Sequence, residues 1–86
     1  MITSKLDFAV TVMNPEEVIW EGRAQSVSSE NSTGPFDILP THANFVTMIK
    51  DKEIRIKTEN GENKALTFKS AVVAVNDNKV SIYSDI

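Results

Sequence analysis

The chain has 86 residues, with nine Lys and Arg against twelve Asp and Glu, which gives a formal net charge of −3. This length excludes two domains, because typical domains have about 100–150 residues. Hydrophobic residues make up 41% and charged residues 24% of the sequence, a balance that excludes a disordered or membrane-spanning chain. A chain this short buries only about 60–65% of the surface that its unfolded form exposes. It can fill one thin core, and a roomy enzyme pocket is disfavoured.

The charges and the missing cysteines narrow the chemistry further. The basic residues are scattered from Lys5 to Lys79, so neither nucleic acid nor an anionic lipid surface has an obvious binding patch. The sequence contains no cysteine, which excludes disulfides, thiolate catalysis and cysteine-ligated metals. The longest apolar run, residues 71–75, is five residues long, and the first ten residues include polar side chains. We therefore expect no signal peptide and a cytoplasmic location.

Alternation of apolar and polar residues predicts short β-strands along the whole chain. From Leu6 to Val12 every second residue is a large apolar one, the period expected when one face of a strand is buried. A second β-rich run covers residues 18–20, and Gly22 is expected to end it. Further strands are predicted at residues 24–28, 36–39, 45–49, 54–57, 65–68, 71–75 and 80–83.

Turn-forming residues separate these segments. The pair Asn60 and Gly61 predicts a hairpin with a type I′ turn, because both central residues of that turn need a positive φ. No window of eleven or more residues shows an apolar stripe with a period of 3.6 residues, so no long helix is expected. About nine short strands with turns every 8–12 residues indicate a β-sandwich or a closed barrel.

Few residues offer catalytic or ligand-binding chemistry. His42 is the only histidine; it could act as a general base with Asp37 nearby, or it could stabilise a loop after the rigid Pro40. The second reading is favoured, because a nucleophile and an orienting carboxylate are not specified. The three glycines are isolated, so no phosphate-binding loop is present. We expect no catalytic residue, no metal site and no cofactor.

Phe36 stands apart from the other aromatic residues. It follows Gly34 and Pro35 in a stretch rich in turn formers. A large apolar side chain near a loop tip can cover the core or anchor a docked partner. Composition and pattern thus lead to a small soluble β domain with a binding or assembly role.

Several ordered motifs give a more specific indication. Residues 33–43 read TGPFDILPTHA, which resembles the signature G-x-[FL]-G-I-L-P-x-H-A-P of the N-terminal β-sandwich domain of the epsilon subunit of F-type ATP synthases, called delta in mitochondria. Residues 12–22, 46–56 and 71–84 are similar to three further segments of that family in the same order. The resemblance extends from about Leu6 to Asp85.

The chain departs from the family pattern at a few positions. Asp37 stands where the family usually has Gly, and Asn44 replaces the Pro that follows His-Ala. Ala74 replaces the usual Glu, and Ser70 with Ala71 replaces a Gly-Gly pair. These changes concern the partner surface more than the fold, since Asp adopts a positive φ more readily than most residues.

The resemblance implies an all-β fold, a small antiparallel β-sandwich of about ten short strands in two sheets, as a single domain over residues 1–86. It implies a non-catalytic rotor subunit of the central stalk, which clamps the gamma subunit onto the c-ring and couples ion-driven rotation to ATP synthesis. Such a subunit is peripheral at the cytoplasmic face of the membrane, which it reaches only through the complex. The C-terminal helical hairpin of the family is expected to be lacking, because the chain ends at Ile86.

The resemblance also assigns two contact surfaces. The surface that faces the polar loops of the c-ring comprises Ser32, Thr33, Gly34, Pro35 and Phe36. The surface that faces gamma includes His42, Ala43 and Thr47. The alternative is a stand-alone β-sandwich adaptor that binds another partner and has no role in an ATP synthase.

Overall fold

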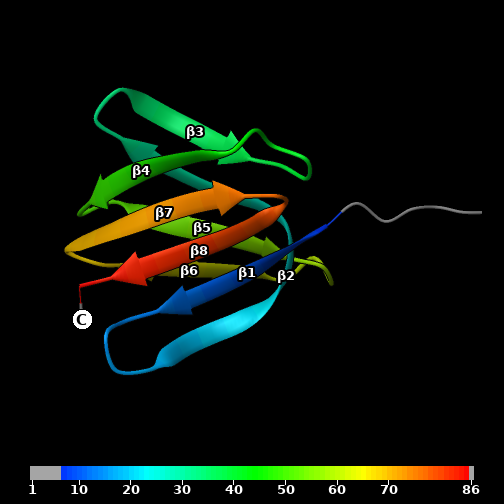
Figure 1. Ribbon diagram of the computed structural model, residues 1–86, viewed down its shortest axis with the longest axis horizontal. Coiled ribbons are helices and arrows are strands. Elements are labelled where there is room, and N and C mark those ends of the chain that lie inside the picture. The colour runs from blue at the N-terminus through cyan, green and yellow to red at the C-terminus, as the bar shows by residue number, and fades with distance from the viewer. Residues whose placement is uncertain (1–6, 86) are drawn as a thin grey trace, which may run out of the picture.

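The structure is a computed structural model that describes residues 7–85, and every helix or strand it contains in this range is a β-strand (Figure 1). Leu6, the first residue of the predicted first strand, lies outside the described residues. The strands are β1 (Phe8–Met13), β2 (Val18–Asn31), β3 (Gly34–Ile38), β4 (Phe45–Lys50), β5 (Glu53–Thr58), β6 (Asn63–Thr67), β7 (Ser70–Asn76) and β8 (Lys79–Ser84).

The strands form one hydrogen-bonded path that folds over into two layers. Its order is β4-β7-β8-β1-β2-β5-β6, with β3 pairing with β2. The first half of β2 pairs with β1, and its second half lies between β3 and β5. One layer therefore contains β4, β7, β8, β1 and the start of β2, and the other contains β3, the end of β2, β5 and β6 (Figure 1). All pairs are antiparallel except β1 with β8.

The two-layer, all-β fold that we expected is confirmed, but the described residues form eight strands instead of about ten. Two predicted strands, residues 18–20 and 24–28, are parts of the single 14-residue strand β2. Gly22 does not end a strand as predicted. It lies within β2, paired with Val10 of β1, and the Trp20 indole lies against it: a Cβ on Gly22 would stand 2.7 Å from Trp20 Cζ2, far inside van der Waals contact.

A β-bulge lets β2 serve both layers. The pairing of β2 with β5 shifts register between Ala24 and Ser26, which gives the strand one extra residue and increases its bend and twist. The buried positions change parity at the same place, from Ala24 to Val27 and Ser29. The inward face is thereby kept on both sides of the bend.

One apolar core fills the space between the layers. Alternate residues of β1, β5, β7 and β8 point into it, as the period of two predicts. The buried hydrophobic residues are Phe8, Val10, Val12, Ala24, Val27, Ile38, Ile49, Ile54, Ile56, Ala71, Val73, Val75, Val80 and Ile82.

Aromatic side chains close the two open sides of the sandwich. Phe36 of β3 and Phe45 of β4 meet edge to face, with ring centroids 5.8 Å apart. At the other side, Lys64 Nζ of β6 lies 5.7 Å from the centroid of the Trp20 ring, within the range of a cation–π contact. All four side chains are partly buried, so the edges of the two layers are covered.

The hairpin at Asn60 and Gly61 is confirmed, but its predicted type is wrong. Gly61 has a φ of 86°, whereas Asn60 has no positive φ. The Gly61 N–H donates to Thr58 O, and the Thr58 N–H donates to Glu62 O, which is the pattern of a type I turn followed by a glycine bulge. Four residues separate β5 from β6, and this loop is too long for a two-residue type I′ turn.

The type I′ turn of this chain connects β7 and β8 instead. Asn76 pairs with Lys79, which leaves a two-residue loop. Its residues Asp77 and Asn78 have φ values of 51° and 62°. Asp and Asn tolerate this left-handed conformation better than other non-glycine residues.

Candidate functional site

The turn between β2 and β3 presents most of the proposed c-ring surface. Ser32 and Thr33 form its tip, and the Asn31 side-chain oxygen accepts bonds from the Thr33 N–H at 2.9 Å and from the Thr33 hydroxyl at 2.7 Å. Gly34 has a φ of 129°, a value that L-residues rarely adopt. Ser32, Thr33 and Pro35 are exposed. The local sequence thus holds a short, polar turn in one shape.

Phe36 belongs to the same segment but points the other way. It is partly buried, packs against the core cluster and contacts the Phe45 ring. The sequence left two roles open for Phe36: it could cover the core or anchor a docked partner. The structure shows contacts for the first role. Any contribution to a docked partner rests on the part of the ring that stays accessible.

His42 and Ala43 lie in the loop between β3 and β4, residues 39–44, at the opposite end of β3 from the Ser32 turn (Figure 1). The His42 N–H donates to Leu39 O at 3.1 Å, and the His42 ring lies 5.0 Å from the Phe45 ring, centroid to centroid. His42 Nδ1 is 2.7 Å from Ala43 O, so Nδ1 holds the proton in this arrangement and Nε2 is the acceptor of the neutral ring. No carboxylate or hydroxyl bonds to this ring among the described residues. This geometry fits the prediction that His42 stabilises a loop.

Thr47 lies in the middle of β4, two residues after Phe45, whose ring contacts His42. It lies on the inward-facing side of β4, and its hydroxyl oxygen accepts a 3.0 Å hydrogen bond from Asn31 Nδ2. This bond ties β4 to the end of β2, next to the Ser32 turn. Thr47 therefore lies between the Ser32 turn, which Asn31 precedes, and the His42 loop with which the resemblance grouped it.

An apolar row crosses the outer face of the layer that contains β4. The pairing registers align one residue from each strand: Met48 opposite Val72, Val72 opposite Tyr83, Tyr83 opposite Met13, and Met13 opposite Val18. Opposed residues of paired strands share a face, so the first four side chains point away from the core. Val18 follows a register shift between Val12 and Met13 and is exposed. We call these five residues the outer apolar row.

The residues beside this row are small or apolar as well. Val46, Ala74, Ser81 and Thr11 form the next row on the same strands. Val46 is 69% exposed, Met48 52% and Tyr83 47%. Contiguous apolar surface of this kind on a small chain marks a contact with another protein or segment.

The outer face of the second layer is polar. Its outward residues on β5 are Glu53, Arg55 and Lys57, and Asn63 and Thr67 are outward and exposed on β6. The two layers therefore differ: one outer face is solvated, and the other has the composition of an interface.

The outer apolar row was not among the predicted surfaces, although the sequence carries a signal for it. Residues 71–75 are apolar at five successive positions, so both faces of that strand are apolar. A strand with one solvated face alternates, whereas a strand covered on both faces does not. The uninterrupted run is therefore the sequence signal for the apolar outer face of β7.

Other features of the described residues add little chemistry. A hollow of about 340 Å³ opens next to the Ser32 turn, lined by Glu30, Asn31, Ser32, Met48, Lys50 and Lys52. Residues 7–85 contain no group of three or more His, Cys, Asp or Glu that could hold a metal ion. No helix long and apolar enough to cross a membrane was found within that range.

Comparison with known proteins connects this geometry to a family. The family described as "ATP synthase, Delta/Epsilon chain, beta-sandwich domain" matches residues 7–86. The ATP synthase epsilon chain of Clostridium novyi is 30% identical over 78 residues, which cover 91% of this chain and 60% of that protein. The epsilon chain of Clostridium perfringens is 34% identical over 74 residues, 86% of this chain and 56% of that protein. This chain thus spans about 60% of the length of the relatives.

Solved structures show the same fold. A chain in the cryo-EM structure of Euglena gracilis mitochondrial ATP synthase, with OSCP, F1 and c-ring, superposes with a TM-score of 0.84 at 17% identity, over 95% of this chain and 52% of that one. A chain of the Tetrahymena thermophila mitochondrial ATP synthase central stalk and c-ring gives 0.78 at 14% identity, over 98% and 67%. The motifs, the two-layer fold and the match over residues 7–86 agree: the chain belongs to the family of ATP synthase delta/epsilon chain β-sandwich domains.

Proposed function

We propose that this chain is a non-catalytic subunit of the central stalk of an F-type ATP synthase. In this role it holds the gamma subunit on the c-ring and couples ion-driven rotation to ATP synthesis. The observation that supports this role most strongly is the family match over residues 7–86. The chain works at the cytoplasmic face of the membrane, which it reaches only through the complex.

The gamma contact combines the loop of residues 39–44 with the outer face of β4. His42 and Ala43 lead directly into this strand, whose outward residues Val46 and Met48 are more than half exposed. The contact then continues along the outer apolar row. Burial of such residues in an interface stabilises a complex by about 1.5–3 kcal/mol for each large side chain that loses contact with water.

The c-ring contact is the turn at the other end of β3. Ser32, Thr33 and Pro35 present exposed polar and small groups there, which suits the polar loops of a membrane ring. Gly34 shapes the turn, and Phe36 supports it from the core side. Thr47 supports it too, through its bond from Asn31.

The test compares two glutamate variants on opposite outer faces. Val46→Glu puts a charge into the proposed gamma contact, whereas Thr67→Glu puts one on the polar face of the second layer; both residues are exposed, so neither change should alter the melting temperature by more than about 2 °C. We expect Val46→Glu to lower retention on immobilised gamma subunit at least about tenfold, because a charge that loses its water in an apolar contact costs more than 1.4 kcal/mol.

Retention on gamma should be unchanged for Thr67→Glu. Equal retention of both variants would show that the outer face of β4 is not the gamma contact. Failure of the unaltered chain to bind gamma or reconstituted c-rings would refute the rotor role and leave a β-sandwich adaptor for another partner.

A further inference from the structure

The loop of residues 39–44 is tied to the turn between β7 and β8 by two reciprocal hydrogen bonds. The Thr41 N–H donates to Asn78 Oδ1 at 2.7 Å, and the Asp77 N–H donates to Asn44 Oδ1 at 2.9 Å. Each segment thus gives one asparagine oxygen to one backbone N–H of the other. We call this pair of bonds the asparagine clasp.

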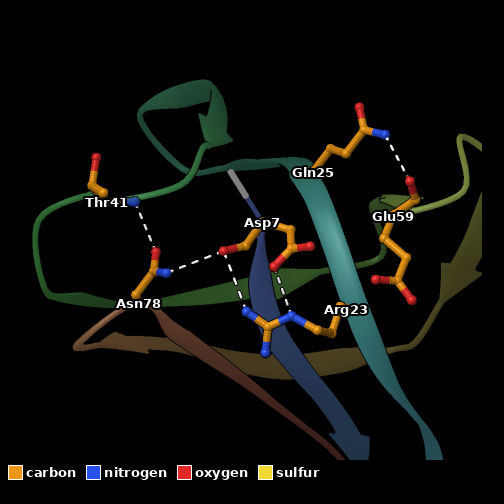
Figure 2. A network of polar contacts seen from close by, with 6 residues as sticks. All are labelled: Asp7, Arg23, Gln25, Thr41, Glu59 and Asn78. Carbon is orange, nitrogen blue, oxygen red and sulfur yellow. Dashed lines mark hydrogen bonds and ion pairs between the residues drawn. The ribbon is translucent and has the colours of Figure 1, made fainter. Parts of the chain in front are cut away.

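The clasp is anchored to the start of β1. Asn78 Nδ2 donates to Asp7 O at 3.1 Å, so a single amide side chain joins three segments (Figure 2). Arg23 of β2 reaches the same residue, with Nε 2.6 Å from Asp7 Oδ1 (Figure 2). The anchor therefore consists of Asp7, directly before β1, and Arg23 of β2, and neither belongs to the loop.

The backbone of both segments is of the kind that needs such support. Thr41 has a φ of 66°, which is unfavourable for a β-branched residue. Asp77 and Asn78 are also left-handed, but they form a regular type I′ turn that is stable without a partner. The backbone strain therefore lies in the loop of residues 39–44, and the β7–β8 turn has regular geometry.

His42 lies between the two points at which the clasp holds the loop. Thr41 precedes it, Asn44 follows it by two residues, and the ring lies on Phe45. Fixing both sides of a short loop limits the conformations that His42 can sample. A loop already in its binding conformation avoids the loss of affinity that follows when only a fraction of molecules is competent to bind.

We propose that Asn78 and Asn44 are positioning residues that hold the His42 loop in its binding conformation before gamma docks. This inference rests on the proposed function, because it takes the loop to be a gamma contact. It also explains why this chain tolerates Asn44: the bond to the Asp77 N–H restrains the loop at this position. The clasp is thus formed entirely by residues of this chain.

The experiment uses the 86-residue chain, four variants of the clasp and its turn, and His42→Ala as the reference for the gamma contact. Asn78→Gly keeps the left-handed backbone and removes both amide bonds, and Asn44→Ala breaks the clasp from the other segment. Asp77→Gly is the matched control, since it makes the same glycine change in the same turn and keeps the N–H that bonds Asn44. Asn78→Asp tests the anchor separately, because its carboxylate can still accept from the Thr41 N–H but cannot donate to Asp7 O.

Three quantities are measured: amide hydrogen exchange at Thr41 and Asp77, the NMR shifts of the His42 ring protons, and the Kd for purified gamma subunit. We expect Asn78→Gly and Asn44→Ala to speed exchange of the N–H that each one releases by about fivefold or more. The His42 ring shifts should move toward random-coil values as the ring leaves Phe45. The Kd should rise about fivefold in Asn78→Gly and Asn44→Ala, whereas Asp77→Gly should stay within about twofold of the unaltered chain and Asn78→Asp should fall between the two.

The outcomes separate this inference from the proposed function. Unchanged exchange and ring shifts in Asn78→Gly and Asn44→Ala would refute the clasp. Faster exchange with an unchanged Kd, while His42→Ala still weakens gamma binding, would refute the positioning role and leave the gamma contact in place. No binding of the unaltered chain to gamma would refute the proposed function and the positioning role together.

Discussion

Replacement of Phe36 by Ala tests whether its ring is part of the core. Complete burial makes a Phe→Ala change cost about 3–5 kcal/mol, and Phe36 is only partly buried, so the burial loss is about half of that. The edge-to-face contact with Phe45 at 5.8 Å adds about 0.5–1.5 kcal/mol. We expect the free energy of unfolding to fall by about 2–4 kcal/mol and Tm to fall by about 8–30 °C, at roughly 4–8 °C per kcal/mol for a domain of this size.

Urea denaturation followed by circular dichroism measures this loss, and a double-mutant cycle with Phe45→Ala locates it. The cycle should give a coupling of about 1 kcal/mol, because the two rings contact each other directly. Phe36→Leu is the control that keeps apolar volume and removes the ring geometry, and it should cost less than half as much. A loss below about 0.5 kcal/mol for Phe36→Ala would refute the core role and leave partner docking as the role of Phe36.

Two further substitutions test the local geometry of β2 and of the β5–β6 turn. Gly22→Ala puts a Cβ 2.7 Å from Trp20 Cζ2, so we expect the indole to move into solvent, with a red shift of Trp fluorescence and a loss of about 1–3 kcal/mol in unfolding free energy. Unshifted emission would contradict this packing. Gly61→Ala should cost about 1–2 kcal/mol, because the φ of 86° at Gly61 is unfavourable for any other residue. Asn60→Ala should cost under about 0.5 kcal/mol, whereas a type I′ turn would make both changes costly in urea denaturation.

The period-two pattern was sufficient to predict the strands but not where one strand continues. In β5, buried Ile54 and Ile56 alternate with exposed charged residues, so the sequence alone indicates both the strand and its inner face. In β2, Gly22 is a residue type that often ends a strand. Here it lies inside the strand, against the Trp20 ring. Side-chain packing of that kind is not contained in a local window of sequence.

Turn types depended on register, which is a tertiary property. Asn60 with Gly61 is the stronger type I′ signal, yet that turn formed between Asp77 and Asn78. The reason is the pairing of Asn76 with Lys79, which leaves only two residues for the connection. Local propensity ranks the candidates, and the strand register selects among them.

The candidate site was predictable as two chain segments but not as a surface. The Ser32 turn and the His42 loop are both present where turn chemistry indicated irregular structure. Thr47 stays a prediction as a gamma contact; its bond from Asn31 on the inner side of β4 could not be predicted, because it depends on how β4 packs on β2. The outer apolar row needed the strand order, since residues 13, 48 and 83 become neighbours only through β7 and β8.

The two proposed contacts are joined by a strand that pairs along its whole length. Every residue of β3 has a partner in β2, from Gly34 opposite Asn31 to Ile38 opposite Val27, and its five residues span about 17 Å. Phe36 is the middle residue of β3 and fixes it to β4 through Phe45. Substitution of a partner-contacting residue at either end of β3 should weaken only the binding of that partner. Phe36→Ala should weaken both, because it loosens the segment that sets the distance between the Ser32 turn and the His42 loop.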